Sequence, residues 1–145
     1  ELSAYSEQSV LFAANSYGCP PGEDEAADCS MVAGGTQYRN FRIPSIVATP
    51  SGTLLAFAEG RVEPHDVTLP ACEGNNISTD DVGDIDVVLR RSVDGGRTWS
   101  NIRRIVDAGC ETVGNPTAVV DQGSGRVWLF LTENAGNIAT SWGLA

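Results

Sequence analysis

The sequence contains no lysine and only one histidine and one methionine in 145 residues. Its nine basic residues are all arginines, and 19 acidic residues bring the formal net charge to −10. Nucleic-acid binding requires a net basic face, so this composition argues against a nucleic-acid-binding protein. A small anionic ligand stays compatible, because a local arginine cluster can dominate the field of one site and arginine suits bidentate recognition of a carboxylate.

The sequence also lacks a C-x-x-C pair. Its four cysteines are Cys19, Cys29, Cys72 and Cys110, and His65 is the only histidine, so we expect no metal site and no cofactor. Four thiols in loop-like surroundings rich in Pro, Gly and Asp are typical of two disulfides and an oxidising compartment. We therefore expect a secreted or extracellular protein, with the lysosome or the cell surface as alternatives.

No apolar run is long enough to span a bilayer, and no long amphipathic helix pattern is present. Short runs rich in Val, Ile, Leu and Phe recur instead, bounded by Gly, Pro, Asn and Asp, and these indicate β-strands. The pattern predicts strands over 9–13, 44–49, 53–59, 84–92, 98–106, 117–121 and 126–132. Two long loops are predicted over 15–40 and 60–83.

Glycine-containing turns separate these strands at 50–52, 93–97 and 122–125. The strand pair that begins at Pro44 is echoed by the pair that begins near Pro116. That echo indicates a repeated four-stranded meander, which is the blade of a β-propeller, with a first blade over 44–106. A β-sandwich has similar short strands, so periodicity alone leaves both all-β folds open.

The turn at 92–99 reads S-V-D-G-G-R-T-W and fits the Asp-box pattern S-x-D-x-G-x-T-W. Its members Ser92, Asp94, Gly96, Thr98 and Trp99 have structural roles. We expect the Asp94 side chain to accept hydrogen bonds from turn amides, the glycines to adopt strained dihedrals and Trp99 to pack under the hairpin. The motif indicates a fold and says nothing about activity.

An F-R-I-P motif at 41–44 precedes the Asp box, with the blocks L-L-A-F-A-E-G-R at 54–61, D-V-G-D-I-D-V-V-L-R-R-S at 81–92 and G-N-P-T at 114–117. In this order the blocks closely resemble the exo-α-sialidase family. The resemblance implies a six-bladed all-β propeller. Residues 1–145 would form the N-terminal part of that single domain: the first blade, part of the second and a closing strand at 9–13.

The resemblance also implies roles for individual residues. Arg42 matches an arginine that clamps the sialic acid carboxylate, and Arg61 matches one near the 4-hydroxyl edge of the sugar. Asp81 matches the general acid/base, with Asp66 as its rival because the loop at 60–83 is longer than we expect for the family. Asn115 matches a substrate-contacting Asp or Asn.

In an antiparallel meander these positions all fall on one rim of the sheet, and the Asp-box turn falls on the opposite rim. Plainer interpretations stay open for three of them. Arg42 could pair with an Asp at the rim, Asp81 could be a solvated loop acid, and Asn115 could simply begin a strand. On the same blade layout we predict the disulfides Cys19–Cys29 and Cys72–Cys110.

The function implied is an exo-α-sialidase that removes terminal α-linked sialic acid with retention of configuration. Family members use a tyrosine nucleophile with a glutamate partner, and we expect this pair beyond residue 145. The expected partners are a sialylated glycan and the remainder of the same propeller. The alternatives are a trans-sialidase and a non-catalytic Asp-box propeller that binds a glycan or a protein.

Overall fold

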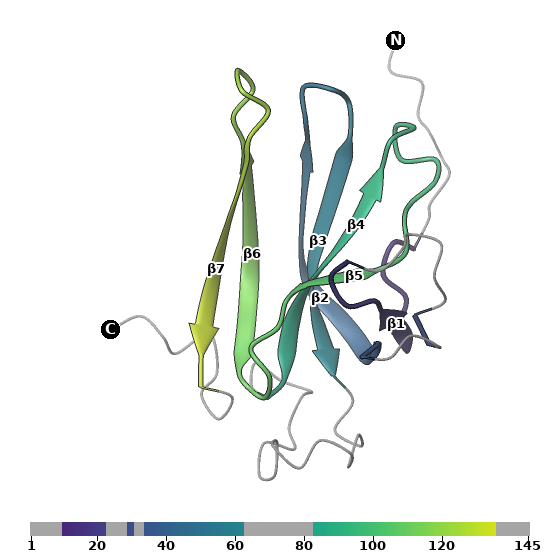
Figure 1. Ribbon diagram of the computed structural model, residues 1–145, viewed down its shortest axis with the longest axis vertical. Coiled ribbons are helices and arrows are strands. Elements are labelled where there is room, and N and C mark those ends of the chain that lie inside the picture. The colour runs from purple at the N-terminus through teal and green to yellow at the C-terminus, as the bar shows by residue number, and fades with distance from the viewer. Residues whose placement is uncertain (1–9, 23–28, 31–33, 63–82, 136–145) are drawn as a thin grey trace.

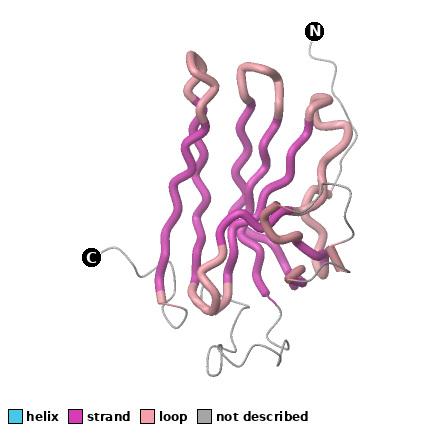
Figure 2. The backbone as a smooth tube through the Cα atoms, in the orientation of Figure 1, coloured by secondary structure: helices cyan, strands magenta, loops and turns pink. Residues whose placement is uncertain are grey.

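The computed structural model describes residues 10–22, 29–30, 34–62 and 83–135. All of the regular structure in these ranges is β (Figure 2). The strands are β1 (Ser16–Gly18), β2 (Thr36–Ala48), β3 (Leu54–Val62), β4 (Ile85–Ser92), β5 (Arg103–Val106), β6 (Thr112–Val120) and β7 (Val127–Asn134). The all-β fold class is therefore confirmed.

The strands form one open, mixed sheet in the order β1-β2-β3-β4-β6-β7, with β5 also paired to β4. Strands β2 to β5 make a four-stranded antiparallel meander, as the sequence predicts. The β6–β7 hairpin joins it through a single parallel pair, Ile85 with Thr112. In Figure 1 the β2–β3 turn, the β6–β7 turn and the end of β4 lie at the same end of the sheet.

Strands β2 and β6 share an irregularity that makes them structural repeats. The β2–β3 ladder skips Ile43-Pro44, and the β6–β7 ladder skips Asn115-Pro116. In both bulges the residue before proline has positive φ, 51° at Ile43 and 52° at Asn115. Such angles are uncommon for non-glycine residues and unusual for a β-branched one. Bulges of this kind re-aim side chains and often lie next to functional sites.

The bulges explain why the predicted strand starts were wrong. The predicted strands start at Pro44 and, just after Pro116, at Thr117. The structure instead places Pro44 and Pro116 inside longer strands, where the bulge accommodates the missing N–H. Strand β2 begins at Thr36, within the region predicted as a loop, because its first residues pair with β1 and with the end of β3.

The predicted closing strand at 9–13 is not a strand where the structure describes it, from Val10 to Ala13. A short apolar run forms a strand only with a partner to pair with. The Leu11 carbonyl accepts a hydrogen bond from Arg90 Nη1 at 2.6 Å rather than from a ladder amide. The short strand β1, just beyond this run, pairs with the start of β2 instead.

The predicted strand at 98–106 is confirmed only over β5. Its first half belongs to the Asp-box turn, because the amide and hydroxyl of Thr98 both bond to Asp94. Ser100 then exchanges hydrogen bonds with Arg91, its amide donating to the Arg91 carbonyl at 2.8 Å and its Oγ accepting from the Arg91 amide at 2.9 Å. The outgoing chain therefore regains the ladder only at Arg103.

The buried apolar cluster lies on one face of the meander and is centred on Tyr38, with Ala58, Val62, Val88 and Ile102 around it. The Tyr38 ring is fully buried and lies against two glycines. A Cβ at Gly18 would be 2.6 Å from the ring, and one at Gly60 would be 2.7 Å from it. Both glycines are therefore required by close approach.

Cys19 and Cys29 form a disulfide on this side of the sheet. The Cys19 amide donates to the Ile102 carbonyl and the Cys19 carbonyl accepts from the Arg104 amide, at 2.9 Å in both cases, which ties the chain between β1 and β2 to the start of β5. Cys110 is also disulfide-bonded. Its predicted partner, Cys72, lies outside the described residues.

Candidate functional site

The structure brings three of the sequence-predicted site residues to one end of the sheet, which we call the rim end. Arg42 in β2 is directly opposite Glu59 in β3, and Arg61 follows two residues later on the same face of β3. Asn115 reaches this place from β6, where its backbone amide donates to Glu59 Oε1 at 2.9 Å. Residues far apart in sequence thus meet around one carboxylate.

Glu59 is a member of this cluster that the sequence analysis did not single out. Its side chain is 1% exposed, and its Oε2 lies 2.7 Å from Arg61 Nη2. The sequence carried a signal for Glu59, because a Glu and an Arg two residues apart on one strand lie on the same face of the sheet. The apolar residues before Glu59 made that stretch of sequence resemble the end of an ordinary buried strand.

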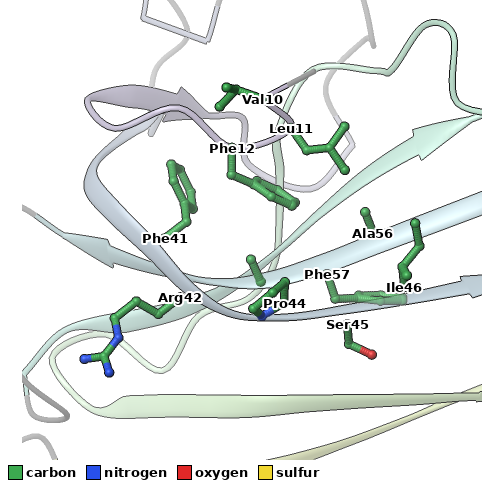
Figure 3. A pocket seen from close by; sticks show the side chains of 11 residues that line it. Val10, Leu11, Phe12, Phe41, Arg42, Pro44, Ser45, Ile46, Ala56 and Phe57 are labelled. Atoms are coloured by element: carbon green, nitrogen blue, oxygen red, sulfur yellow. The ribbon is translucent and has the colours of Figure 1, made fainter. Parts of the chain in front are cut away.

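Arg42 and Arg61 differ in exposure, although the resemblance implies substrate contact for both. Arg42 is exposed, whereas Arg61 is fully buried. In Figure 3 the guanidinium of Arg42 points away from the apolar side chains of Val10, Leu11 and Phe12. Of these two arginines, Arg42 is therefore the one that can meet a ligand from solvent without rearrangement.

A hollow of about 400 Å³ lies beside Arg42. The N-terminal segment and strands β2 and β3 supply its lining, which includes Phe12, Phe41, Ile46 and Phe57 (Figure 3). This lining is largely apolar, and a sialic acid carries a carboxylate and several hydroxyls. We therefore place no sugar in this hollow.

The predicted acid/base Asp81 and its rival Asp66 both lie outside the described residues. The described acids nearest to Asp81 in sequence are Asp84, directly before β4, and Asp86, the second residue of β4. The pKa of Asp84 is raised to about 7, mainly by burial and also by Asp107, while Arg104 opposes the change. This corner of the sheet thus favours protonated carboxyls near neutral pH.

Asp86 belongs to a buried polar group on the face opposite Glu59. Its Oδ2 accepts a hydrogen bond of 2.6 Å from the Tyr38 hydroxyl, and Arg104 Nη1 is 3.9 Å away. The pKa of Asp86 is raised to about 8, mainly by burial. Asp84 and Asp107 also raise this pKa, whereas the hydrogen bond from Tyr38 and the charge of Arg104 lower it. Burial also raises the pKa of Tyr38, with Asp86 adding to the effect. The group joins β2, β4 and β5 in the core.

The Asp-box turn lies at the other end of the sheet, which we call the Asp-box end. Asp94 Oδ1 accepts hydrogen bonds from Ser92 Oγ at 2.8 Å and from the Thr98 amide at 3.0 Å, and Oδ2 accepts from Thr98 Oγ1 at 2.6 Å. The Thr98 and Ser92 bonds lower the pKa of Asp94. Gly96 has φ +90°, and its carbonyl accepts from Trp99 Nε1 at 3.0 Å. Asp94 is therefore committed to the turn.

Two further features concern ligands and membranes. Within the described ranges, no group of three or more His, Cys, Asp or Glu side chains is arranged to hold a metal ion. The same part of the chain includes no helix with the length and apolar character that a membrane span needs.

Comparison with known proteins finds sialidases that are similar to this chain. An exo-alpha-sialidase from Arthroderma benhamiae is 36% identical over 118 residues, which are 77% of this chain and 25% of that protein. An exo-alpha-sialidase from Aspergillus fumigatus is 36% identical over 106 residues, 69% of this chain and 22% of that protein. The chain is homologous to the exo-α-sialidases.

A bacterial sialidase, from Micromonospora viridifaciens, is 32% identical over 117 residues, which are 77% of this chain and 16% of that protein. This sialidase homologue thus spans a quarter or less of the length of these relatives. No protein-family model matches it. The resemblance stated from the F-R-I-P and Asp-box motifs is confirmed by these matches.

Proposed function

We propose that the protein containing this chain is an exo-α-sialidase that hydrolyses terminal α-linked sialic acid from glycoproteins, glycolipids or oligosaccharides. The observation that carries the proposal is the convergence of Arg42 and Asn115, from β2 and β6, at one end of the sheet in a sialidase homologue. Arg42 is exposed there. An exposed guanidinium at a rim suits the carboxylate of a sialic acid.

The fold proposed for the whole protein is a six-bladed propeller, with β2 to β5 as its first blade and β6–β7 opening the second. Two features support it: the four-stranded meander and the repeat of the X-Pro bulge in β2 and β6. Val119, Trp128 and Phe130 are at least half exposed on one face of the β6–β7 hairpin. In this proposal the remainder of the propeller covers that face.

The reaction assigns a proton-transfer role to Asp81, or to its rival Asp66. The carboxyl gives its proton to the glycosidic oxygen as the bond from that oxygen to the anomeric carbon breaks. A tyrosine beyond residue 145 bonds to the anomeric carbon and gives its hydroxyl proton to its glutamate partner. The carboxylate then takes a proton from the water that displaces the tyrosine, and the glutamate returns its proton to the departing tyrosine oxygen. Two displacements retain configuration, and the placed acid contributes about 10²–10⁴-fold.

Arg42 and Asn115 bind the sugar in this proposal, and Arg61 lies in the floor beneath it. Because Arg61 is fully buried, it contacts the 4-hydroxyl edge of the sugar only once its side chain is uncovered. Secretion is part of the proposal, and the Cys19–Cys29 disulfide supports it because such bonds persist in oxidising compartments.

The test is hydrolysis of a fluorogenic sialoside by the full-length protein and its Arg42→Ala variant. Losing one or two charge-assisted bonds of about 1.5–3 kcal/mol each predicts a fall in kcat/KM of roughly 10-fold to more than 1000-fold. Arg91→Ala is the matched control, because Arg91 is an exposed arginine at the Asp-box end. A folded wild-type protein that releases no sugar, or an equal loss in both variants, contradicts the proposal.

The acid is tested by comparing Asp81→Asn with Asp66→Asn on two substrates. An aryl sialoside needs little protonation of its leaving oxygen, whereas an alkyl-linked sialoside such as sialyllactose needs much. The variant that lacks the acid should therefore lose far more kcat/KM on sialyllactose. Product transferred to a sugar acceptor instead of water indicates a trans-sialidase, and binding without cleavage indicates a non-catalytic propeller.

A further inference from the structure

One buried carboxylate joins two strands that belong to different hairpins. Glu59 Oε2 accepts from Arg61 Nη2 at 2.7 Å, and Glu59 Oε1 accepts from the Asn115 amide at 2.9 Å. Glu59 is 1% exposed and Arg61 is fully buried. Each oxygen of Glu59 thus holds one residue of the proposed site, Arg61 in its floor or Asn115 at the sugar.

Strand β6 is shaped to receive this carboxylate. A Cβ at Gly114 would collide with Glu59 Oε1 and lie 3.1 Å from its Cδ. Gly114 does not have positive φ, so its lack of a side chain matters for close approach and not for backbone freedom. The equivalent position in the β2 repeat is occupied by Arg42, which precedes Ile43-Pro44 as Gly114 precedes Asn115-Pro116.

The carboxylate also stabilises an unusual backbone conformation. Asn115 has φ 52° inside the β6 bulge. The Glu59 bond holds its amide, and its side-chain Nδ2 donates to Thr132 Oγ1 in β7 at 3.0 Å. The Thr132 hydroxyl in turn donates to the Gly114 carbonyl at 3.3 Å. A residue with sparsely populated angles persists only where its surroundings constrain it, and here they do so on both sides.

We propose that Glu59 is a positioning residue of the sialidase site, and this rests on the proposed function. One of its oxygens fixes the guanidinium of Arg61 and the other fixes the backbone of Asn115, so a single side chain sets the spacing between Asn115, which binds the sugar, and Arg61 in the floor beneath it. Misplacing such groups by about 1 Å costs up to about 100-fold in rate.

The competing interpretation is that the Glu59–Arg61 pair only stabilises the sheet. Removing one partner of a buried ion pair leaves an uncompensated charge and is strongly destabilising, whereas replacing both partners by neutral groups is often tolerated. The two interpretations therefore differ in what they predict for sugar binding by folded Glu59→Gln protein. A purely structural role predicts a loss of stability with an unchanged KM.

The experiment compares Glu59→Gln with the double variant Glu59→Gln/Arg61→Gln in the full-length protein, measuring kcat, KM and the unfolding midpoint. We expect Glu59→Gln to raise KM for a sialoside by about 10-fold or more. The neutral pair should regain the unfolding midpoint, which identifies the unpaired buried charge as the cause of any loss of stability in Glu59→Gln. Only the KM of the single variant reports on positioning, because the double variant also lacks Arg61. An unchanged KM in folded Glu59→Gln overturns the proposal.

A second measurement does not depend on sialidase activity. The Asn115 amide proton, observed in asparagine-labelled full-length protein, should resonate downfield because it bonds to a carboxylate, and it should move upfield in Glu59→Ala. Asp86→Asn is the matched control, since it changes a buried carboxyl on the opposite face. An inactive wild-type protein that still shows this shift refutes the proposed function but not the bond. An Asn115 resonance unaffected by Glu59→Ala refutes the positioning.

Discussion

The two ends of the sheet are stabilised by different kinds of contact. At the Asp-box end, Asp94 bonds to Ser92 and Thr98, which are two and four residues away in the chain. At the rim end, Tyr38 bonds to Asp86 across 48 residues and Asn115 bonds to Glu59 across 56. The Asp-box turn therefore supplies its own hydrogen-bond partners, whereas the rim exists only when distant strands have met.

This difference predicts how each end responds to substitution. Changes at the rim end remove contacts that join several strands, so their cost includes the loss of packing around them. Changes at the Asp-box end affect one turn. The four predictions that follow test this contrast in the full-length protein and run from the largest expected effect to the smallest.

Replacing Tyr38 should have the largest effect on stability. Its buried ring packs with Ala58, Val88 and Ile102, and its hydroxyl donates to Asp86. We expect Tyr38→Ala to lower the free energy of unfolding by about 3–5 kcal/mol, measured by denaturant unfolding. Tyr38→Phe keeps the ring and should cost about 1–3 kcal/mol, because only the Asp86 bond is lost. An equal cost for both would show that packing contributes nothing.

The buried Asp86 should make stability depend on pH. Its pKa is raised to about 8 from 3.8, so between these values the folded state binds more protons than the unfolded state and stability falls as pH rises. Asp86→Asn removes this contribution, which is at most about 1.4 kcal/mol per pH unit or about 3 kcal/mol from pH 5 to 7. The variant should therefore lose less stability than wild type over that interval in denaturant unfolding.

Asp121→Asn is the control for this pH dependence. Bonds from Ser124 and Gly123 lower the pKa of Asp121 below 3.8, so its contribution is already complete above that value and is lost only as pH falls further. Its replacement should leave the slope between pH 5 and 7 unchanged. If Asp86→Asn also leaves that slope unchanged, Asp86 is ionised in the folded protein.

The same contrast explains how far the sequence predicts this molecule. The Asp box could be predicted residue by residue, because its bonds span at most four positions. The grouping of Arg42, Arg61 and Asn115 at one end also follows from the strand order. Glu59 could not be predicted as a shared partner, because its contact with Asn115 depends on how β6 packs against β3. The burial of Arg61 and the bulges that place two prolines inside strands could not be predicted from the sequence either.

Gly60→Ala at the rim end should lower the free energy of unfolding by less than Tyr38→Ala does. Gly60 does not have positive φ, so alanine fits its backbone, but a Cβ there would be 2.7 Å from Tyr38 Cδ1. Overpacking of this kind costs about 1–3 kcal/mol. Combining Gly60→Ala with Tyr38→Leu should cost less than the sum of the two single changes in denaturant unfolding, because the smaller side chain removes the clash. Strict additivity would contradict the proposed contact.

The smallest loss of stability is expected from Gly96→Ala at the Asp-box end, where the cause is backbone strain and not a clash with a side chain. A Cβ at Gly96 would be 3.5 Å from Leu54 and 3.8 Å from Trp99, which is ordinary contact, but φ is +90°. Backbone strain alone should cost about 1–2 kcal/mol in denaturant unfolding. Because no side chain causes the strain, Leu54→Ala should add to it without relief. Strong coupling between these two changes would mean that the Asp-box end depends on packing in the same way as the rim end.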